Sequence, residues 1–273
     1  MTGTELAEAD IERYSRHVLL REVGGAGQRK LKAASAFVVG AGGLGSPAAL
    51  YLAAAGVGRI GIADGDRVEL SNLQRQIAHR TADVGRPKVR SATDAVLALN
   101  PGCKVEAFEE RLSADSIGRI VNGYDVVLDG SDTFATRFLV ADFCRLSGIP
   151  LVSAAASRFE GQLLTVLPEA GSPCYRCLIP EPPPPGAVPG CREAGIFGPA
   201  VGVMGVLQAL EACKLLLGIG EGFAMRLLAF DALAGSFRTI DRAADPNCPL
   251  CGERPTITGP VEYEPPSCGR DGS

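Results

Sequence analysis

The sequence predicts an α/β fold: a mostly parallel, Rossmann-like sheet with helices on both faces, extended by antiparallel strands. Two observations predict this class. Predicted strands alternate with predicted helices up to about residue 156, which is typical of a parallel sheet covered on both sides. The pattern Gly40-Ala41-Gly42-Gly43-Leu44-Gly45 lies between a strand and a helix, as it does in nucleotide-binding βαβ units.

The elements of the first half follow from local signals in the sequence. Residues 8–22 are predicted to form a helix that three glycines between positions 24 and 27 bring to an end. A helix is predicted from Pro87 to Leu99, because proline is tolerated at a helix start and Asn100-Pro101 stops it. The other predicted strands are residues 35–40, 59–64, 103–109, 124–129 and 151–156, and the other predicted helices are about 46–55, one between 109 and 124, and 133–147.

The second half changes character. Residues 163–167 and 226–240 are predicted to form antiparallel strands, and the proline-rich residues 180–190 an exposed loop. Residues 199–217 predict an apolar helix whose Gly202 and Gly205 permit close packing. We expect one domain over residues 1–253, with a nucleotide-binding half at about 30–157 and a second half at about 158–253, followed by a mobile tail at 254–273.

Composition excludes several classes of protein. Hydrophobic residues make up 46% of the 273 and charged residues 21%, which indicates a globular protein. The net charge is −4 without a cluster of lysine and arginine, so nucleic acid is not an expected partner. The uncharged residues 33–58 contain Pro47 and six glycines and predict a strand, turn and helix instead of a membrane span. The acidic N-terminus lacks a signal peptide pattern, so a cytoplasmic protein is expected.

The glycine pattern and Asp64 together predict a nucleotide site. Asp64 ends the second predicted strand, where a carboxylate can hold a ribose hydroxyl. By themselves these residues leave open an NAD-dependent oxidoreductase, or glycines that serve turn geometry alone.

Two cations favour a triphosphate over NAD. Arg75 lies in Ser71-Asn72-Leu73-Gln74-Arg75-Gln76, and Lys88 ends Gly85-Arg86-Pro87-Lys88. Arginine offers a planar fork for phosphate oxygens and lysine a compact charge, and such cations lower barriers to phosphoryl transfer. The alternative is that both are solvated surface charges.

Carboxylates follow another predicted strand in Asp129-Gly130-Ser131-Asp132-Thr133. At the carboxyl edge of the sheet, Asp132 could hold a Mg²⁺ ion that bridges ATP phosphates. Alternatively, Asp132 or Thr133 caps the following helix.

The cysteines predict a structural metal site. Two C-x-x-C pairs can form a tetrahedral zinc site that joins the end of the chain to its middle; the alternative is a redox dithiol. The four are Cys174, Cys177, Cys248 and Cys251. A fifth, Cys191, follows the proline-rich loop and is either a nucleophile or a bystander. His17 and His79 are the only histidines, and no Ser/His/Asp arrangement is predicted.

In their chain order, these motifs resemble the MoeB/ThiF family of ubiquitin-activating-like adenylyltransferases, most closely its molybdopterin-synthase sulfur-carrier members. The resemblance extends from Arg13-Tyr14-Ser15-Arg16 to Cys251. It implies that a small ubiquitin-like sulfur carrier protein ending in Gly-Gly attacks ATP through its carboxylate, giving an acyl-adenylate and pyrophosphate. A sulfur donor then forms a thiocarboxylate, in molybdopterin biosynthesis or a related pathway. The carboxylate is already ionised at neutral pH, so no catalytic base is required.

The resemblance also implies roles for residues. Asp64 would bind the ribose, Arg75 and Lys88 the phosphates, and Asp132 the Mg²⁺. Arg16 would reach the neighbouring subunit's site, which implies a homodimer. The remaining residues expected beside the nucleotide are Gly43, Ser71, Asn72, Leu73, Gln74 and Thr133.

Two departures from the family pattern bear on function. Thr133 stands where many members carry asparagine, so an amide contact to nucleotide or metal is expected to be lost. No rhodanese-like domain is expected from the sequence after Cys251, so sulfur is expected from a separate desulfurase or rhodanese, or through Cys191. The alternatives left open are adenylation with a covalent thioester or persulfide at Cys191 (thiamine, thiolated-tRNA or natural-product pathways), a zinc-stapled NAD-binding oxidoreductase, and a non-catalytic scaffold.

Overall fold

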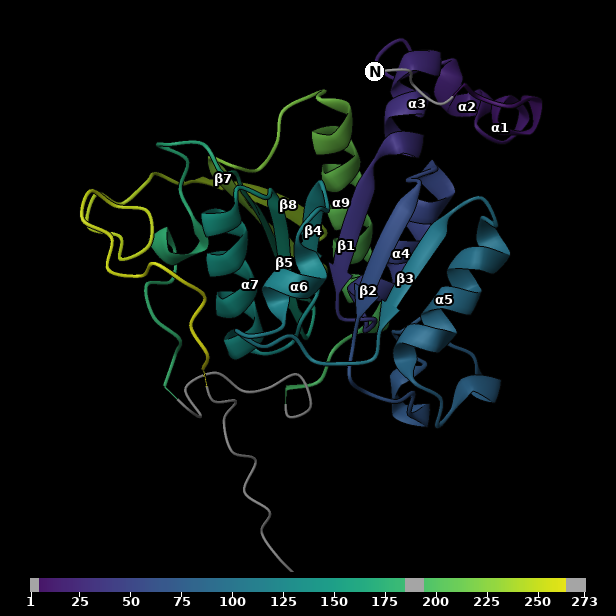
Figure 1. The fold of residues 1–273 in the computed structure, drawn as a ribbon. Helices are drawn as coiled ribbons and strands as arrows, with labels where there is room; N and C mark the ends of the chain where they lie inside the picture. The colour runs from purple at the N-terminus through teal and green to yellow at the C-terminus, as the bar shows by residue number, and fades with distance from the viewer. Residues whose placement is uncertain (1–4, 185–193, 264–273) are drawn as a thin grey trace, which may run out of the picture.

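A single eight-stranded sheet forms the centre of the computed structural model, which describes residues 5–184 and 194–263. The strand order is β3-β2-β1-β4-β5-β6-β7-β8 (Figure 1). The strands are β1 (Ser35–Val39), β2 (Arg59–Ala63), β3 (Lys104–Phe108), β4 (Val126–Asp129), β5 (Leu151–Ser157), β6 (Glu160–Val166), β7 (Arg226–Asp231) and β8 (Ser236–Asp241).

The sheet is parallel from β3 to β5 and antiparallel from β5 to β8, as the sequence predicts. The strand β1 has β2 on one side and β4 on the other, so the direction of winding reverses there. In open α/β sheets, ligands bind at the carboxyl ends of strands beside such a reversal.

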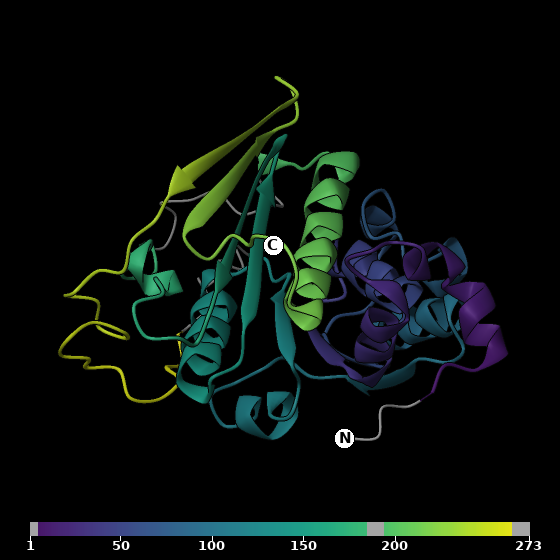
Figure 2. The ribbon, with the colours of Figure 1, turned by 90° about the horizontal axis from the view of Figure 1, so that it is seen from above.

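Helices cover both faces of the sheet (Figures 1 and 2). Alternate residues of β1 separate the two cores: Ala36 and Val38 face one side, and Phe37 and Val39 the other. The first core contains α3 (Gly24–Ala33), α4 (Gly45–Ala55), α5 (Lys88–Leu99) and α9 (Gly198–Leu217), and the second contains α6 (Ile117–Val121) and α7 (Phe134–Ser147). The described residues also form three short 3₁₀ helices: η1 (Leu70–Asn72), η2 (Thr81–Asp83) and η3 (Tyr175–Cys177).

The prediction for the N-terminal region is wrong in two respects. The predicted helix 8–22 is two short helices, α1 (Glu8–Arg13) and α2 (Ser15–Val18), separated at Tyr14. The glycines predicted to end it instead belong to α3. A Cβ on Gly27 would lie 3.1 Å from Leu217 Cδ2, so glycine allows α3 to pack closely on the end of α9, and this packing overrides glycine's low helix propensity.

By length and composition alone, the helix α9 could cross a membrane. However, half of its apolar 18-residue stretch is buried in the fold. It packs on α4 and on β4, β5 and β6. The prediction that two of its glycines permit close packing is correct for only one of them. A Cβ on Gly205 would lie 2.4 Å from the Leu44 carbonyl oxygen, whereas no described heavy atom lies within 4 Å of one on Gly202.

Candidate functional site

The glycine loop occupies the carboxyl edge of the parallel strands, between β1 and α4. Gly40 has φ of +87°, a conformation that favours glycine. A Cβ on Gly45 would lie 1.7 Å from the Gly40 carbonyl oxygen, so no larger residue fits there. The loop thus brings the N-terminus of α4 to an open edge, where main-chain N–H groups and the helix dipole favour an anion.

Asp64, directly after β2, supports this loop. Its Oδ2 accepts a hydrogen bond from the Ala41 N–H at 2.9 Å, and its Oδ1 accepts one from the Asp66 N–H at 2.8 Å. Burial raises the pKa of Asp64 above its usual range, although the nearby ammonium of Lys88 opposes the shift. The carboxylate therefore holds the glycine loop in place.

Lys88 is not a solvated surface charge. Its side chain is only 9% exposed, and its Nζ lies 3.0 Å from Asp66 Oδ2 and 4.0 Å from Asp64 Oδ2. Asp66 Oδ1 also accepts a hydrogen bond from the guanidinium of Arg111, which follows β3, at 2.8 Å. The structure thus gathers two cations and two carboxylates at the ends of neighbouring strands.

The hexapeptide 71–76 lies against the glycine loop and α9. Arg75 donates to the Ser71 carbonyl at 3.0 Å, and its Cγ would lie 3.4 Å from a Cβ on Gly43. A Cβ on Gly198, the first residue of α9, would meet the Gln74 carbonyl oxygen at 2.2 Å. Two helix N-termini therefore border Arg75.

The other residues of the hexapeptide differ in exposure. Ser71 is exposed and Leu73 partly exposed, whereas Asn72 is buried and its Oδ1 accepts from the Glu69 N–H. Gln76 is also buried, and its Oε1 has no hydrogen-bond partner among the described residues.

The residues of the motif 129–133 have different structural roles. Asp129 is buried and accepts hydrogen bonds from Ser131 and Ser153. Thr133 is the N-cap of α7, because its Oγ1 accepts from the Thr136 N–H at 3.2 Å. Asp132 is exposed and forms no hydrogen bond with the residues that the structure describes. Of the two residues predicted as possible caps, Thr133 therefore caps α7. The Asp132 carboxylate is left available for a ligand.

Arg16 lies far from this edge of its own chain. It is exposed on α2, next to Tyr14, whose hydroxyl accepts from Asn100 Nδ2 at 2.8 Å. Asn100 follows the C-terminus of α5, so α2 sits at the edge where the parallel strands begin (Figure 1). Cys191 falls outside the described residues, and so does most of the proline-rich loop before it.

The two C-x-x-C pairs come together as the sequence predicts. Cys174 Sγ lies 3.8 Å from Cys177 Sγ and 3.5 Å from Cys248 Sγ, and Cys177 Sγ lies 3.4 Å from Cys251 Sγ. A tetrahedral zinc site with bonds of about 2.3 Å places its sulfur atoms about 3.8 Å apart. Burial raises the pKa of Cys174, and that of Cys251 to about 11. A divalent cation would supply the charge that four clustered thiolates need, so these residues fit a closed metal site.

Sequence reasoning missed three residues of the nucleotide edge. His79 Nε2 donates to the Ala41 carbonyl at 3.0 Å, and its Nδ1 contacts Ser91 Oγ at 2.9 Å. Asp66 and Arg111 are the other two. Both follow strand ends, a signal that could have found them, whereas the contact of His79 with the loop depends on tertiary structure.

Comparisons with known proteins agree on one family. A sequence model of the ThiF family matches residues 14–250. The chain is 51% identical over 260 residues to the sulfur carrier protein adenylyltransferase of Thermus thermophilus, covering 93% of this chain and 96% of that protein. It is 50% identical to the SAMP-activating enzyme E1 of Haloferax volcanii, covering 91% of each. It is also 50% identical to the adenylyltransferase and sulfurtransferase MOCS3 of Bos taurus, covering 95% of this chain but 57% of that protein.

Solved structures show the same fold. PaaA matches with a TM-score of 0.76 at 23% identity, covering 90% of this chain and 77% of that one. E. coli MccB crystallised with ATP matches with a TM-score of 0.76 at 21% identity, covering 88% and 74%. At these identities the likeness concerns the fold alone.

Proposed function

The chain belongs to the ThiF family, and we propose that it is an ATP-dependent adenylyltransferase that activates the C-terminal glycine of a small ubiquitin-like sulfur carrier protein ending in Gly-Gly. The relatives named for this activity are about half identical over more than nine tenths of the chain. The single observation that carries the proposal is that the Lys88–Asp64 pair and Arg75 each lie beside the glycine loop, with the exposed Asp132 following the neighbouring strand β4.

The chemistry requires positioning more than proton transfer. A carboxylate oxygen of the carrier attacks the α-phosphorus of ATP, a C–O–P bond forms, and the bond to the leaving pyrophosphate breaks. We assign the ribose to Asp64 and the phosphates to Arg75 and Lys88, with the main chain at Gly43 against the nucleotide. Cations held in place before the reaction neutralise the charge that develops on the phosphate oxygens.

Two metal ions complete the proposal. Asp132 would hold a Mg²⁺ ion, which neutralises phosphate charge when bound, and Thr133 would lie beside it as the helix cap. The four clustered cysteines would hold a structural zinc ion, because four protein ligands leave no position open for substrate. We assign nucleotide binding to about 30–157 and the carrier and the zinc to about 158–253; the sheet changes from parallel to antiparallel at the same place.

A homodimer would complete each nucleotide site. Exposed Arg16 lies at the sheet edge opposite its own glycine loop, where only another subunit could use it. Large apolar side chains are exposed among the described residues, including Leu19 on the N-terminal segment, Tyr51 on α4 and Leu210 on α9. We expect a cytoplasmic enzyme that receives sulfur from a separate desulfurase or rhodanese, with a covalent role of Cys191 as the alternative.

The test is release of pyrophosphate from ATP and Mg²⁺, with and without candidate carriers that end in Gly-Gly. Carrier-dependent release is expected, and Arg75→Ala and Asp132→Ala should each lower it at least a hundredfold. Arg80→Ala is the control, because Arg80 is an exposed cation in the same segment. Intact release in either site variant would overturn the assignment of these residues, and ATP binding without release would favour a binding module.

A further inference from the structure

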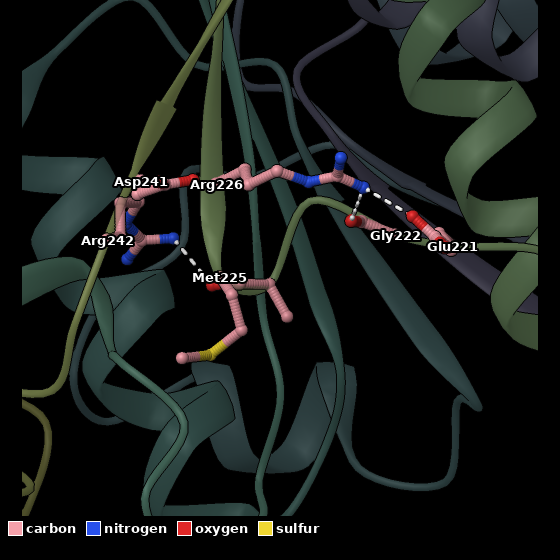
Figure 3. A pocket seen from close by; sticks show the side chains of 7 residues that line it. Glu221, Gly222, Met225, Arg226, Asp241 and Arg242 are labelled. Atoms are coloured by element: carbon pink, nitrogen blue, oxygen red, sulfur yellow. Dashed lines mark hydrogen bonds and ion pairs between the residues drawn. The ribbon is translucent and has the colours of Figure 1, made fainter.

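Arg242 is a buried cation that contacts main-chain carbonyl groups instead of acids. It directly follows β8, and its guanidinium donates to the carbonyls of Cys174 at 2.9 Å, Ala224 at 3.3 Å, and Pro173 and Thr165 at 3.4 Å. Its own N–H donates to the Met225 carbonyl at 2.8 Å (Figure 3). These partners belong to β6, to the segment before β7 and to the first cysteine pair, so one side chain joins three parts of the fold.

The charge of Arg242 is not matched by a carboxylate. None of the ion pairs between described residues includes it. Two neighbouring arginines differ: buried Arg176 makes two 2.8 Å contacts with Asp142, and Arg226 meets exposed Glu221 at 3.1 Å. A buried cation without an anion is costly to the fold, so an opposing charge is expected nearby.

The cysteine cluster is the nearest source of an opposing charge that the contacts indicate. The Arg242 guanidinium donates to the main-chain carbonyl of Cys174, one of the four clustered cysteines, at 2.9 Å, and to that of Pro173 beside it at 3.4 Å. Four thiolates around a divalent cation carry a net charge of about −2, since each ligand is deprotonated. Arg176 is already neutralised by Asp142, whereas Arg242 has no carboxylate partner among the described residues.

We propose that Arg242 is the positioning residue and counter-charge of the four-cysteine metal site, and that it ties the bound metal to the antiparallel end of the sheet. The inference rests on the proposed metal site and not on adenylation. Coupling between two such groups is reciprocal, so Arg242 strengthens metal binding and the metal in turn holds the β7–β8 hairpin in place.

The experiment separates charge from hydrogen bonding. Arg242→Lys keeps the charge with fewer donors, and Arg242→Gln keeps donors without charge. Competition with a chromogenic chelator measures zinc affinity in the full chain. We expect Arg242→Gln to weaken zinc binding about tenfold to a hundredfold, as loss of partners to metal ligands typically does, and Arg242→Lys to weaken it far less. Arg226→Gln, in the same view of Figure 3, is the matched control and should bind zinc as the unaltered chain does.

Two results would overturn the proposal: zinc affinity in Arg242→Gln within twofold of the unaltered chain, or a larger loss in Arg242→Lys than in Arg242→Gln. If the variants do not fold, the unaltered chain still tests it. Removing zinc with a chelator should accelerate amide hydrogen exchange over residues 225–242, and unchanged exchange there would contradict the coupling. Failure of carrier adenylation would leave all of these measurements unaffected.

Discussion

Both main-chain polar groups of Ala41 are hydrogen-bonded to side chains. Asp64 accepts from the Ala41 N–H, while His79 and Ser46 donate to the Ala41 carbonyl oxygen. Because a carbonyl can only accept, His79 must carry a proton on Nε2, and Nδ1 of the neutral ring is then free to accept from Ser91 Oγ. The glycine loop therefore depends on the neutral form of a histidine.

The stability of the chain should accordingly fall on acidification through His79. Burial lowers the pKa of His79, and the charge of Lys88 adds to this effect. The unfolded chain takes up a proton near pH 6.5 that the folded chain takes up only at lower pH, so this contribution is complete above about 6.5 and is lost below it.

His79→Gln can still donate to Ala41 but does not titrate, so the slope of unfolding free energy against pH between 5 and 7 should become shallower. His79→Leu should in addition cost about 1 kcal/mol at pH 7.5, because the loop loses a donor. Denaturant unfolding at a series of pH values measures both effects. An unchanged slope in His79→Gln would exclude the histidine as the source.

Asp132 and Thr133 are adjacent but should respond differently to substitution. Thr133→Ala removes the cap of α7 and should cost about 1 kcal/mol of unfolding free energy, whereas Thr133→Asn should cost little, since asparagine also caps helices. Asp132→Asn should leave stability unchanged and lower carrier-dependent pyrophosphate release at least a hundredfold. Thermal unfolding and the release assay, run on the same three proteins, check the separation. A stability loss in Asp132→Asn would mean that this carboxylate serves the fold.

The candidate site was predictable where chemistry and spacing coincide in the sequence. Gly40 to Gly45, Asp64 and the four cysteines occur in spacings that indicate their partners, and the structure brings each set together. His79 carries no such signal. Its partners Ala41 and Ser91 are 38 and 12 residues away and meet it only after the sheet forms.

At the scale of elements, the predicted bounds are accurate where the hydrophobic periodicity and the residues that end helices indicate the same boundaries. The strand β1, the helix α4 and the strand β2 lie within one residue of their predicted bounds. The helix α3 was missed because its glycines argue locally against a helix; of the three, Gly27 is the one against which α9 packs. Local propensity cannot report a packing partner that lies almost two hundred residues away.

The two glycines of α9 offer an internal test of that packing. Gly205→Ala would push a methyl group into the Leu44 carbonyl at 2.4 Å and into Pro47, so it should destabilise the chain by about 1–3 kcal/mol. Gly202→Ala meets open space among the described residues and should be neutral or stabilise by up to about 1 kcal/mol, because alanine is the better helix former. Chemical denaturation of both variants checks this; equal effects would mean that α9 does not press on α4.

At the scale of the whole molecule, the proposed homodimer would account for both the exposed apolar residues and the remote Arg16. The exposed side chains Val203 and Leu210 lie seven residues apart on α9 and so share a face of the helix. A two-fold symmetric dimer would bury this face on its own copy and would carry each Arg16 toward the partner's glycine loop. Each nucleotide site would then contain residues from both subunits.

Complementation between inactive variants tests this arrangement. A dimer of one Arg16→Ala subunit and one Asp132→Ala subunit contains one site in which both residues are intact, so, purified through two different affinity tags, it should show about half the activity of the unaltered dimer. The matched control pairs Arg75→Ala with Asp132→Ala. If both of these residues serve the site of their own chain, each site of that dimer keeps one defect and activity should stay low. Recovery in the first pair but not in the second would show that Arg16 acts across the interface. No recovery in either pair would contradict a role of Arg16 in the partner's site. Within its own chain, Arg16 lies at the edge of the sheet opposite the glycine loop.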